Sequence, residues 1–117
     1  MPKIKLKFYQ KPSCTTCRKA KAFLEDEGAE LETRDMDKQP LSEKELNELI
    51  GQRDYKTFLN TRNELYRERN MGERPPAQEE AIRLMSKHPN LIRRPVVVRG
   101  KEVVLGFDVT EYLRLLQ

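Results

Sequence analysis

The segment Phe8–Ala20 reads FYQKPSCTTCRKA and places a Cys-x-x-Cys pair at the boundary between two hydrophobic patterns. Before the pair, apolar residues and lysines alternate along residues 3–9, which is typical of a strand with one buried face. After it, apolar side chains recur at helical spacing as far as Gly28, a residue that commonly ends helices. The sequence therefore predicts a strand, then the cysteine pair, then a helix that begins near Cys14.

The elements on either side of this boundary extend the pattern to the whole chain. Leu31–Met36 is predicted as a second strand, and two strands joined by a helix pair in parallel. The helices predicted next are Ser42–Ile50, Tyr55–Leu59, Asn63–Arg69 and Ala77–Ser86. Val96–Val98 and Val103–Leu105 then form a hairpin, and Asp108 begins a last helix that ends at Leu116. This order predicts an α/β fold with a mixed sheet.

The chain has the length of one domain, with 117 residues. It contains no repeat, low-complexity tract or linker, so we predict a single domain over 1–117 with a helical insertion at about 42–92. In a capping box, the side chain of the first capping residue accepts a hydrogen bond from the backbone of the residue three positions later, whose side chain accepts one in return. Such boxes are predicted for Ser42 with Glu45 and for Asp108 with Glu111.

The first ten residues, MPKIKLKFYQ, have neither an apolar core segment nor a small-residue cleavage site, so they do not form a signal peptide. The chain also has no run of about 18 apolar residues, the length that a membrane span requires. We therefore expect a cytoplasmic protein that does not bind a membrane. A monomer is a separate expectation, which these observations do not determine.

The charges of the chain are unevenly distributed around a formal net charge of +4. Residues 1–21 carry seven Lys or Arg residues and no acid, whereas the middle of the chain is acidic. The aromatic residues are not interleaved with the basic ones, and no helix-turn-helix or similar reading motif is present. The composition therefore disfavours nucleic acid as the partner.

Cys14 and Cys17 are the two cysteines of the chain, and their spacing points to redox or metal chemistry rather than to a structural disulfide. A thiol at a helix N-terminus faces unpaired N–H groups and the positive end of the helix dipole, which lower its pKa. Lys11 and Arg18 add positive charge nearby, and Cys17 can resolve a mixed disulfide on Cys14. With His88 as the single histidine, no metal site is expected.

Four segments together resemble the arsenate reductase (ArsC) family and its relatives, the Spx redox regulators. In chain order they are FYQKPSCTTCRKA (Phe8–Ala20), LNTRNELYRE (Leu59–Glu68), LIRRPVVV (Leu91–Val98) and VLGF (Val104–Phe107). Each segment alone is only modestly specific for this family. The four segments in this order span nearly the whole chain, and the set is highly specific. The resemblance implies a thioredoxin-like fold with a helical insertion before the final hairpin, in which Pro95 is the cis-proline that faces the cysteine.

The resemblance also implies roles for individual residues. Cys14 would be the attacking cysteine, and Arg62 and Arg94 would bind an oxyanion or stabilise the thiolate. Arginine suits this task because its paired N–H donors match the oxygens of a tetrahedral oxyanion. The backbone N–H groups at the start of the helix, those of Thr15 and Thr16, would complete the cradle.

The chain departs from glutaredoxin-coupled arsenate reductases at three places. Those enzymes usually have a histidine shortly before the cysteine, where this chain has Gln10 and Lys11. They carry a third oxyanion-binding arginine where this chain has Gly106-Phe107, as in the Spx-like branch. They generally have serine in place of Cys17. A second cysteine would allow an intramolecular disulfide and reduction by a thioredoxin-type partner.

Three functions stay open at this point. The first is a thiol oxidoreductase of arsenate-reductase type, without a bound cofactor, that acts on a small oxyanion or a disulfide and is reduced by glutathione with glutaredoxin or by thioredoxin. The second is an Spx-like redox sensor that binds RNA polymerase and is switched by a disulfide between Cys14 and Cys17. The third is a thioredoxin-like domain whose disulfide serves no substrate. All three place the chemistry at Cys14.

Overall fold

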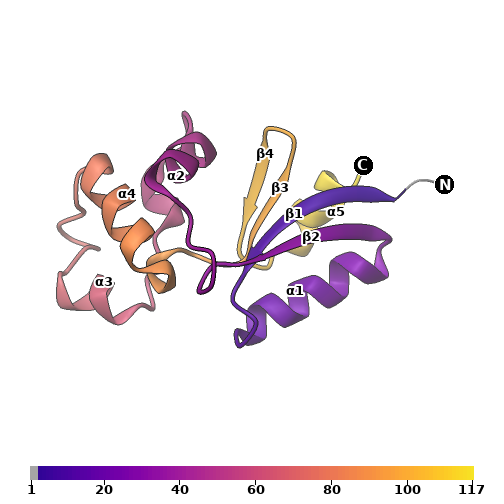
Figure 1. The fold of residues 1–117 in the computed structure, drawn as a ribbon, viewed down its shortest axis with the longest axis horizontal. Coiled ribbons are helices and arrows are strands. Elements are labelled where there is room, and N and C mark those ends of the chain that lie inside the picture. Colours follow the sequence, from indigo (N-terminus) through magenta and orange to yellow (C-terminus); the bar gives the residue numbers. More distant parts are fainter. Residues whose placement is uncertain (1–2) are drawn as a thin grey trace. The chain divides into compact units, whose positions relative to one another are not determined.

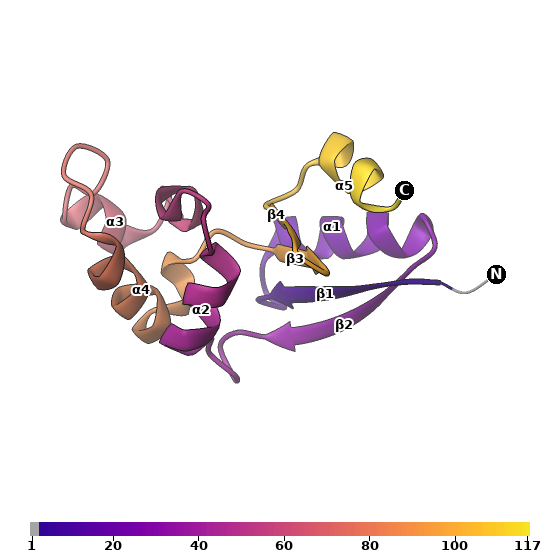
Figure 2. The same ribbon diagram turned by 90° about the horizontal axis from the view of Figure 1, so that it is seen from above.

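The computed structural model describes residues 3–117, which fall into two compact units (Figures 1 and 2). The first unit combines residues 3–36 with Arg94–Gln117, and it contains the sheet and both cysteines. The second unit, Asp37–Arg93, is helical and covers the stretch predicted as an insertion. That the two units form one domain stays a prediction.

A four-stranded mixed sheet forms the first unit, with the strand order β2-β1-β3-β4. The strands are β1 (Ile4–Gln10), β2 (Ala29–Asp35), β3 (Val96–Arg99) and β4 (Glu102–Leu105). β1 is parallel to β2, with Leu6 opposite Leu31, and antiparallel to β3, with Phe8 opposite Val97. The parallel pair needs a crossover, which α1 (Thr15–Asp26) provides. The predicted α/β fold with a mixed sheet is confirmed.

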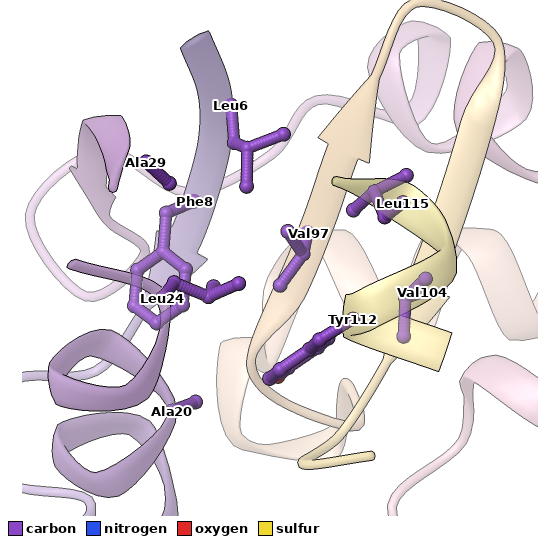
Figure 3. Close-up of a cluster of buried hydrophobic side chains, with 9 residues drawn as sticks. All are labelled: Leu6, Phe8, Ala20, Leu24, Ala29, Val97, Val104, Tyr112 and Leu115. Carbon is purple, nitrogen blue, oxygen red and sulfur yellow. The ribbon is translucent and has the colours of Figure 1, made fainter. Parts of the chain in front are cut away.

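Helices α1 and α5 (Val109–Leu115) lie on one face of this sheet and bury a hydrophobic core against it (Figures 2 and 3). The core consists of Leu6, Phe8, Ala20, Leu24, Ala29, Val97, Val104, Tyr112 and Leu115. Successive side chains of a strand point to opposite faces, so Leu6 and Phe8 enter the core while Lys5 and Lys7 stay exposed. The alternation predicted for this strand is therefore confirmed.

Two glycines allow turns that other residues would strain. Gly28 has φ +91° directly after the C-terminal end of α1, and Gly100 has φ +59° in the hairpin between β3 and β4. A residue with a β-carbon rarely adopts such positive values. Gly28 lies at the predicted helix end, and Gly100 lies between the two strands of the predicted hairpin.

The second unit consists of short helices held together by their own contacts. They are α2 (Glu43–Ile50), α3 (Glu64–Glu68), α4 (Gln78–Lys87) and the 3-10 turns η1 (Tyr55–Phe58) and η2 (Pro89–Leu91). The Tyr55 hydroxyl donates to the Pro76 carbonyl at 2.7 Å, and the Ser86 hydroxyl donates to the Leu41 carbonyl at 2.8 Å. Long-range bonds of this kind fix loops that lack regular pairing of their own.

The two predicted capping boxes differ in outcome. At α2 the box is complete, because the Glu45 N–H donates to Ser42 Oγ at 3.1 Å and the Ser42 N–H donates to Glu45 Oε1 at 3.0 Å. At α5 the Glu111 N–H donates to Asp108 Oδ1 at 3.1 Å, but the Glu111 carboxylate contacts Arg114 instead of returning to the cap. The prediction of a reciprocal box there was wrong, because Arg114 competes for the same carboxylate.

Candidate functional site

Cys14 forms the N-cap of α1, at the end of the turn that follows β1. Its backbone N–H donates to the Lys11 carbonyl at 2.9 Å, and its carbonyl accepts the first helical bond, from Arg18, at 3.1 Å. Its backbone is extended, with φ −81° and ψ 121°, and its thiol is partly exposed. The predicted position of Cys14 at a helix start is thus confirmed.

Thr15, Thr16 and Cys17 make up the first turn of α1, where backbone N–H groups have no partner inside the helix. Among these groups, the backbone N–H of Cys17 donates a hydrogen bond to the sulfur of Cys14. The side chains of Thr15 and Thr16 are exposed. That their N–H groups bind an oxyanion stays a prediction.

The thiol of Cys14 has a pKa below the usual value for cysteine. Burial raises this pKa, but hydrogen bonds from the backbone N–H and the thiol of Cys17 lower it, as do the hydrogen bond and the positive charge of Arg94. A larger fraction of Cys14 is therefore thiolate, the nucleophilic form, at neutral pH. The guanidinium that lowers this pKa belongs to Arg94, which is distant from Cys14 in sequence.

Cys17 has the opposite properties. Its side chain is fully buried, and burial raises its pKa to about 12, with a further increase from the neighbouring Cys14. The backbone N–H of Lys11 and the charge of Arg94 offset only part of this effect. The pair is therefore asymmetric, with a reactive outer sulfur and a protonated inner one.

Arg94 and Pro95 join the second unit to β3 and bring the guanidinium to Cys14. The peptide bond between them is cis, in agreement with what the resemblance implies for Pro95. Pro95 is buried, and its carbonyl accepts a hydrogen bond from the Gly106 N–H at 2.9 Å. Gly106 therefore holds the segment that carries Arg94.

Arg62 lies in the second unit, in the turn before α3. Its side chain is exposed, and its backbone N–H donates to Asn60 Oδ1 at 3.1 Å. The structure brings Cys14, Cys17 and Arg94 together by direct contacts. A role for Arg62 in binding an oxyanion stays a prediction.

Tyr112 is a residue of this region that the sequence reasoning missed. Its side chain is fully buried, and its hydroxyl donates to the Gly106 carbonyl. Burial raises the pKa of Tyr112, and the charges of Cys17 and Asp108 raise it further. The available signal was weak: an aromatic residue one turn after the cap of a helix is more often only a core residue.

Both cysteines are free thiols in the structure. In residues 3–117, no three or more His, Cys, Asp or Glu side chains are grouped so that they could hold a metal ion. None of the helices in that part of the chain is long and apolar enough to cross a membrane.

The asymmetry of the two cysteines leads to a prediction about alkylation. At pH 7, iodoacetamide is expected to label Cys14 in the folded protein and to leave Cys17 unlabelled, because Cys14 has the lowered pKa and Cys17 is buried with a pKa of about 12. The labelling rate of Cys14 should reach its plateau at a lower pH than that of an ordinary thiol. Fragment mass spectrometry locates the label.

Unfolding in urea provides the control for this labelling. Both thiols should then react, with the pH dependence of ordinary cysteines, because burial, the helix start and Arg94 no longer act on them. Equal labelling of Cys14 and Cys17 in the folded protein would contradict the described site.

A cysteine pair at the start of the helix that joins two parallel strands, together with a cis-proline before an antiparallel hairpin, defines a protein of thioredoxin-like fold. Residues 9–115 match the model of the ArsC family, so the match covers nearly the whole chain. The chain belongs to the ArsC family, which includes the Spx-like branch.

Individual relatives support both branches of this family. The global transcriptional regulator Spx from Bacillus subtilis is 31% identical over 110 residues, which cover 92% of this chain and 84% of the relative. An ArsC family related protein from Bacteroides fragilis has a similar structure, with a TM-score of 0.84, 33% identity, and coverage of 95% of this chain and 98% of that one. The arsenate reductase from Vibrio cholerae has a TM-score of 0.85 at 26% identity, with 98% and 100% covered.

Proposed function

We propose that this protein is a thiol-dependent oxidoreductase of arsenate-reductase type, in which Cys14 is the nucleophile and Cys17 the resolving cysteine. The observation that carries this proposal is the asymmetry of the pair: Cys14 has a lowered pKa beside Arg94, while Cys17 is buried and protonated. Two-step thiol chemistry needs one thiolate that attacks the substrate and a second thiol that later attacks the first sulfur. The similarity to the Vibrio cholerae arsenate reductase supports an oxyanion as the substrate.

The proposed reaction balances with two thiols per arsenate. The Cys14 thiolate forms a sulfur–arsenic bond, and one oxygen of arsenate leaves as water after it takes up protons. Cys17 then loses its proton and attacks the Cys14 sulfur, which forms the disulfide. The electron pair of the sulfur–arsenic bond stays on arsenic, so As(V) is reduced to As(III) and leaves as arsenite. An external dithiol, such as thioredoxin, then reduces the disulfide by exchange.

The positive groups around Cys14 have two tasks in this scheme. Arg94 stabilises the thiolate before the attack and offers paired N–H donors to the oxygens of the incoming oxyanion. We propose that the backbone N–H groups of Thr15 and Thr16 contribute further donors to the same oxyanion. The chain would thus need no bound cofactor.

An NADPH-coupled assay of arsenate reduction tests the proposal. The purified protein is supplied in one series with thioredoxin and thioredoxin reductase, and in another with glutathione, glutaredoxin and glutathione reductase. Turnover is expected with the thioredoxin system, because the second cysteine lets the oxidised protein leave the reaction as an intramolecular disulfide. The absence of turnover in both systems would contradict an arsenate-reducing enzyme.

A second function, an Spx-like redox-sensing regulator that binds RNA polymerase, is favoured by the similarity to the Bacillus subtilis regulator. The same cysteine pair would then act as a switch, since oxidation removes the thiolate of Cys14 from its contact with Arg94. Affinity capture of RNA polymerase subunits by the reduced and the oxidised protein tests this role. Capture that depends on the redox state would support the regulator, and capture in neither state would count against it.

A further inference from the structure

Tyr112 is the one member of the buried core cluster in the first unit whose side chain carries a hydrogen-bonding group (Figure 3). All other members of that cluster are aliphatic residues or phenylalanine. A buried hydroxyl needs a partner, and that of Tyr112 donates to the Gly106 carbonyl. Tyr112 therefore connects the core under α5 to the short segment that leads from β4 to α5.

From Gly106 the connection continues to the reactive cysteine. The Gly106 N–H donates to the Pro95 carbonyl at 2.9 Å. The preceding residue, Arg94, contacts Cys14 through its guanidinium. A continuous path of hydrogen bonds and one peptide link thus runs from Tyr112 through Gly106 and Pro95 to the group that stabilises the Cys14 thiolate.

The ring of Tyr112 is itself held by neighbours on two sides. Phe23 of α1 lies at a centroid distance of 6.1 Å, and Phe107 lies at 5.7 Å with its ring nearly perpendicular. The Cys17 sulfur lies close enough to the Tyr112 hydroxyl for the ionised form of Cys17 to raise the pKa of Tyr112, so the hydroxyl is near the cysteine pair. The Tyr112 hydroxyl, which begins this path, therefore has a fixed position close to the cysteine pair.

We propose that Tyr112 is a positioning residue, which holds Gly106 and Pro95 so that the Arg94 guanidinium stays beside the Cys14 sulfur. This inference deepens the proposed function, since it concerns the reactivity of the same cysteine. Tyr112 touches neither Cys14 nor a substrate in this account, and it acts only through the position of Arg94. Without its hydroxyl, the Gly106 carbonyl loses its donor, the Pro95 segment gains freedom, and Arg94 spends less time on the thiolate.

The test is the rate at which iodoacetamide alkylates Cys14 as a function of pH, measured on wild type and on Tyr112→Phe. The variant keeps the ring and its packing and removes only the hydroxyl. At pH 6 the variant is expected to react about threefold more slowly, because a smaller fraction of Cys14 is thiolate. At pH 9.5 the two rates should coincide. A loss of stability alone would not move the midpoint of this profile.

Tyr55→Phe is the matched control, because the Tyr55 hydroxyl also donates to a backbone carbonyl, that of Pro76, in a partly buried hydrogen bond, but in the second unit. Its profile is expected to match that of wild type. An Arg94→Ala background provides the second control: there, Tyr112→Phe should cause no further change, because the group through which it acts is gone. A profile of Tyr112→Phe equal to that of wild type, or an equal shift in Tyr55→Phe, would overturn the proposal.

A second variant covers the case in which Tyr112→Phe does not fold. 4-Aminophenylalanine at position 112 keeps an N–H donor at the same place on the ring, and its alkylation profile is expected to coincide with that of wild type. A rate at pH 6 that is about threefold or more below that of wild type would overturn the proposal. Alkylation needs no arsenate and no donor system, so this result is independent of whether the proposed reductase activity is found.

Discussion

Cys14→Ser is expected to abolish arsenate reduction with every electron donor. Serine keeps the size of the side chain and the helix start, but a hydroxyl does not ionise near neutral pH and forms no disulfide. The thiolate that Arg94 and the Cys17 N–H stabilise is then absent, and no other group in the site can replace it. The loss in kcat/KM should be at least about a thousandfold, as for other nucleophile replacements.

The coupled assay measures this loss, and Ser13→Ala is the neighbouring control. Ser13 is exposed and lies in the turn before α1, so its side-chain hydroxyl should be dispensable. Cys17→Ser separates the two steps, because it should keep the attack by Cys14 but remove turnover that depends on thioredoxin. Full activity of Cys14→Ser in either donor system would remove Cys14 from the mechanism.

Phe8→Ala is expected to have the largest effect on stability. The Phe8 side chain is fully buried between the sheet and α1 in the core of the first unit, and its removal leaves a cavity under β1 (Figure 3). Replacing a buried phenylalanine by alanine typically costs about 3–5 kcal/mol of unfolding free energy. Domains of this size have about 5–15 kcal/mol in total, so the variant should be at the limit of folding.

Urea unfolding followed by circular dichroism gives the free energy of unfolding for this variant. Phe107→Ala is the matched control, because Phe107 is also aromatic but 41% exposed. Its cost should be about 1 kcal/mol or less, as for most partly exposed positions. Similar costs for the two variants would show that the core does not depend on β1 in the way described.

Most elements of the fold are predictable because their signals are local. The alternation before Cys14, the helical spacing after it and the turn at Gly100 each depend on a few adjacent residues, and each appears in the structure. The errors also have a local cause. The box predicted at Asp108 fails because the carboxylate of Glu111 has a competing partner, Arg114, that a two-residue pattern does not consider.

The site is predictable only in part. Cys14 and Cys17 follow from spacing and from the position of the pair at a helix start. Arg94 is distant from Cys14 in sequence, and only the resemblance pointed to it; the physical reason for its position is that β3 pairs with β1. Tyr112 had no such signal, because its role depends on which backbone carbonyl its hydroxyl reaches in the folded chain.

The most direct test of the central claim, that Cys14 attacks and Cys17 resolves, is a single turnover followed by intact-protein mass spectrometry. The reduced protein is mixed with arsenate in the absence of any other thiol and of oxygen. We expect one arsenite per chain and a mass decrease equal to two hydrogen atoms, located in a Cys14–Cys17 disulfide. Arsenite formed by Cys17→Ala without another thiol, or an unchanged mass and no arsenite in the wild type, would contradict it.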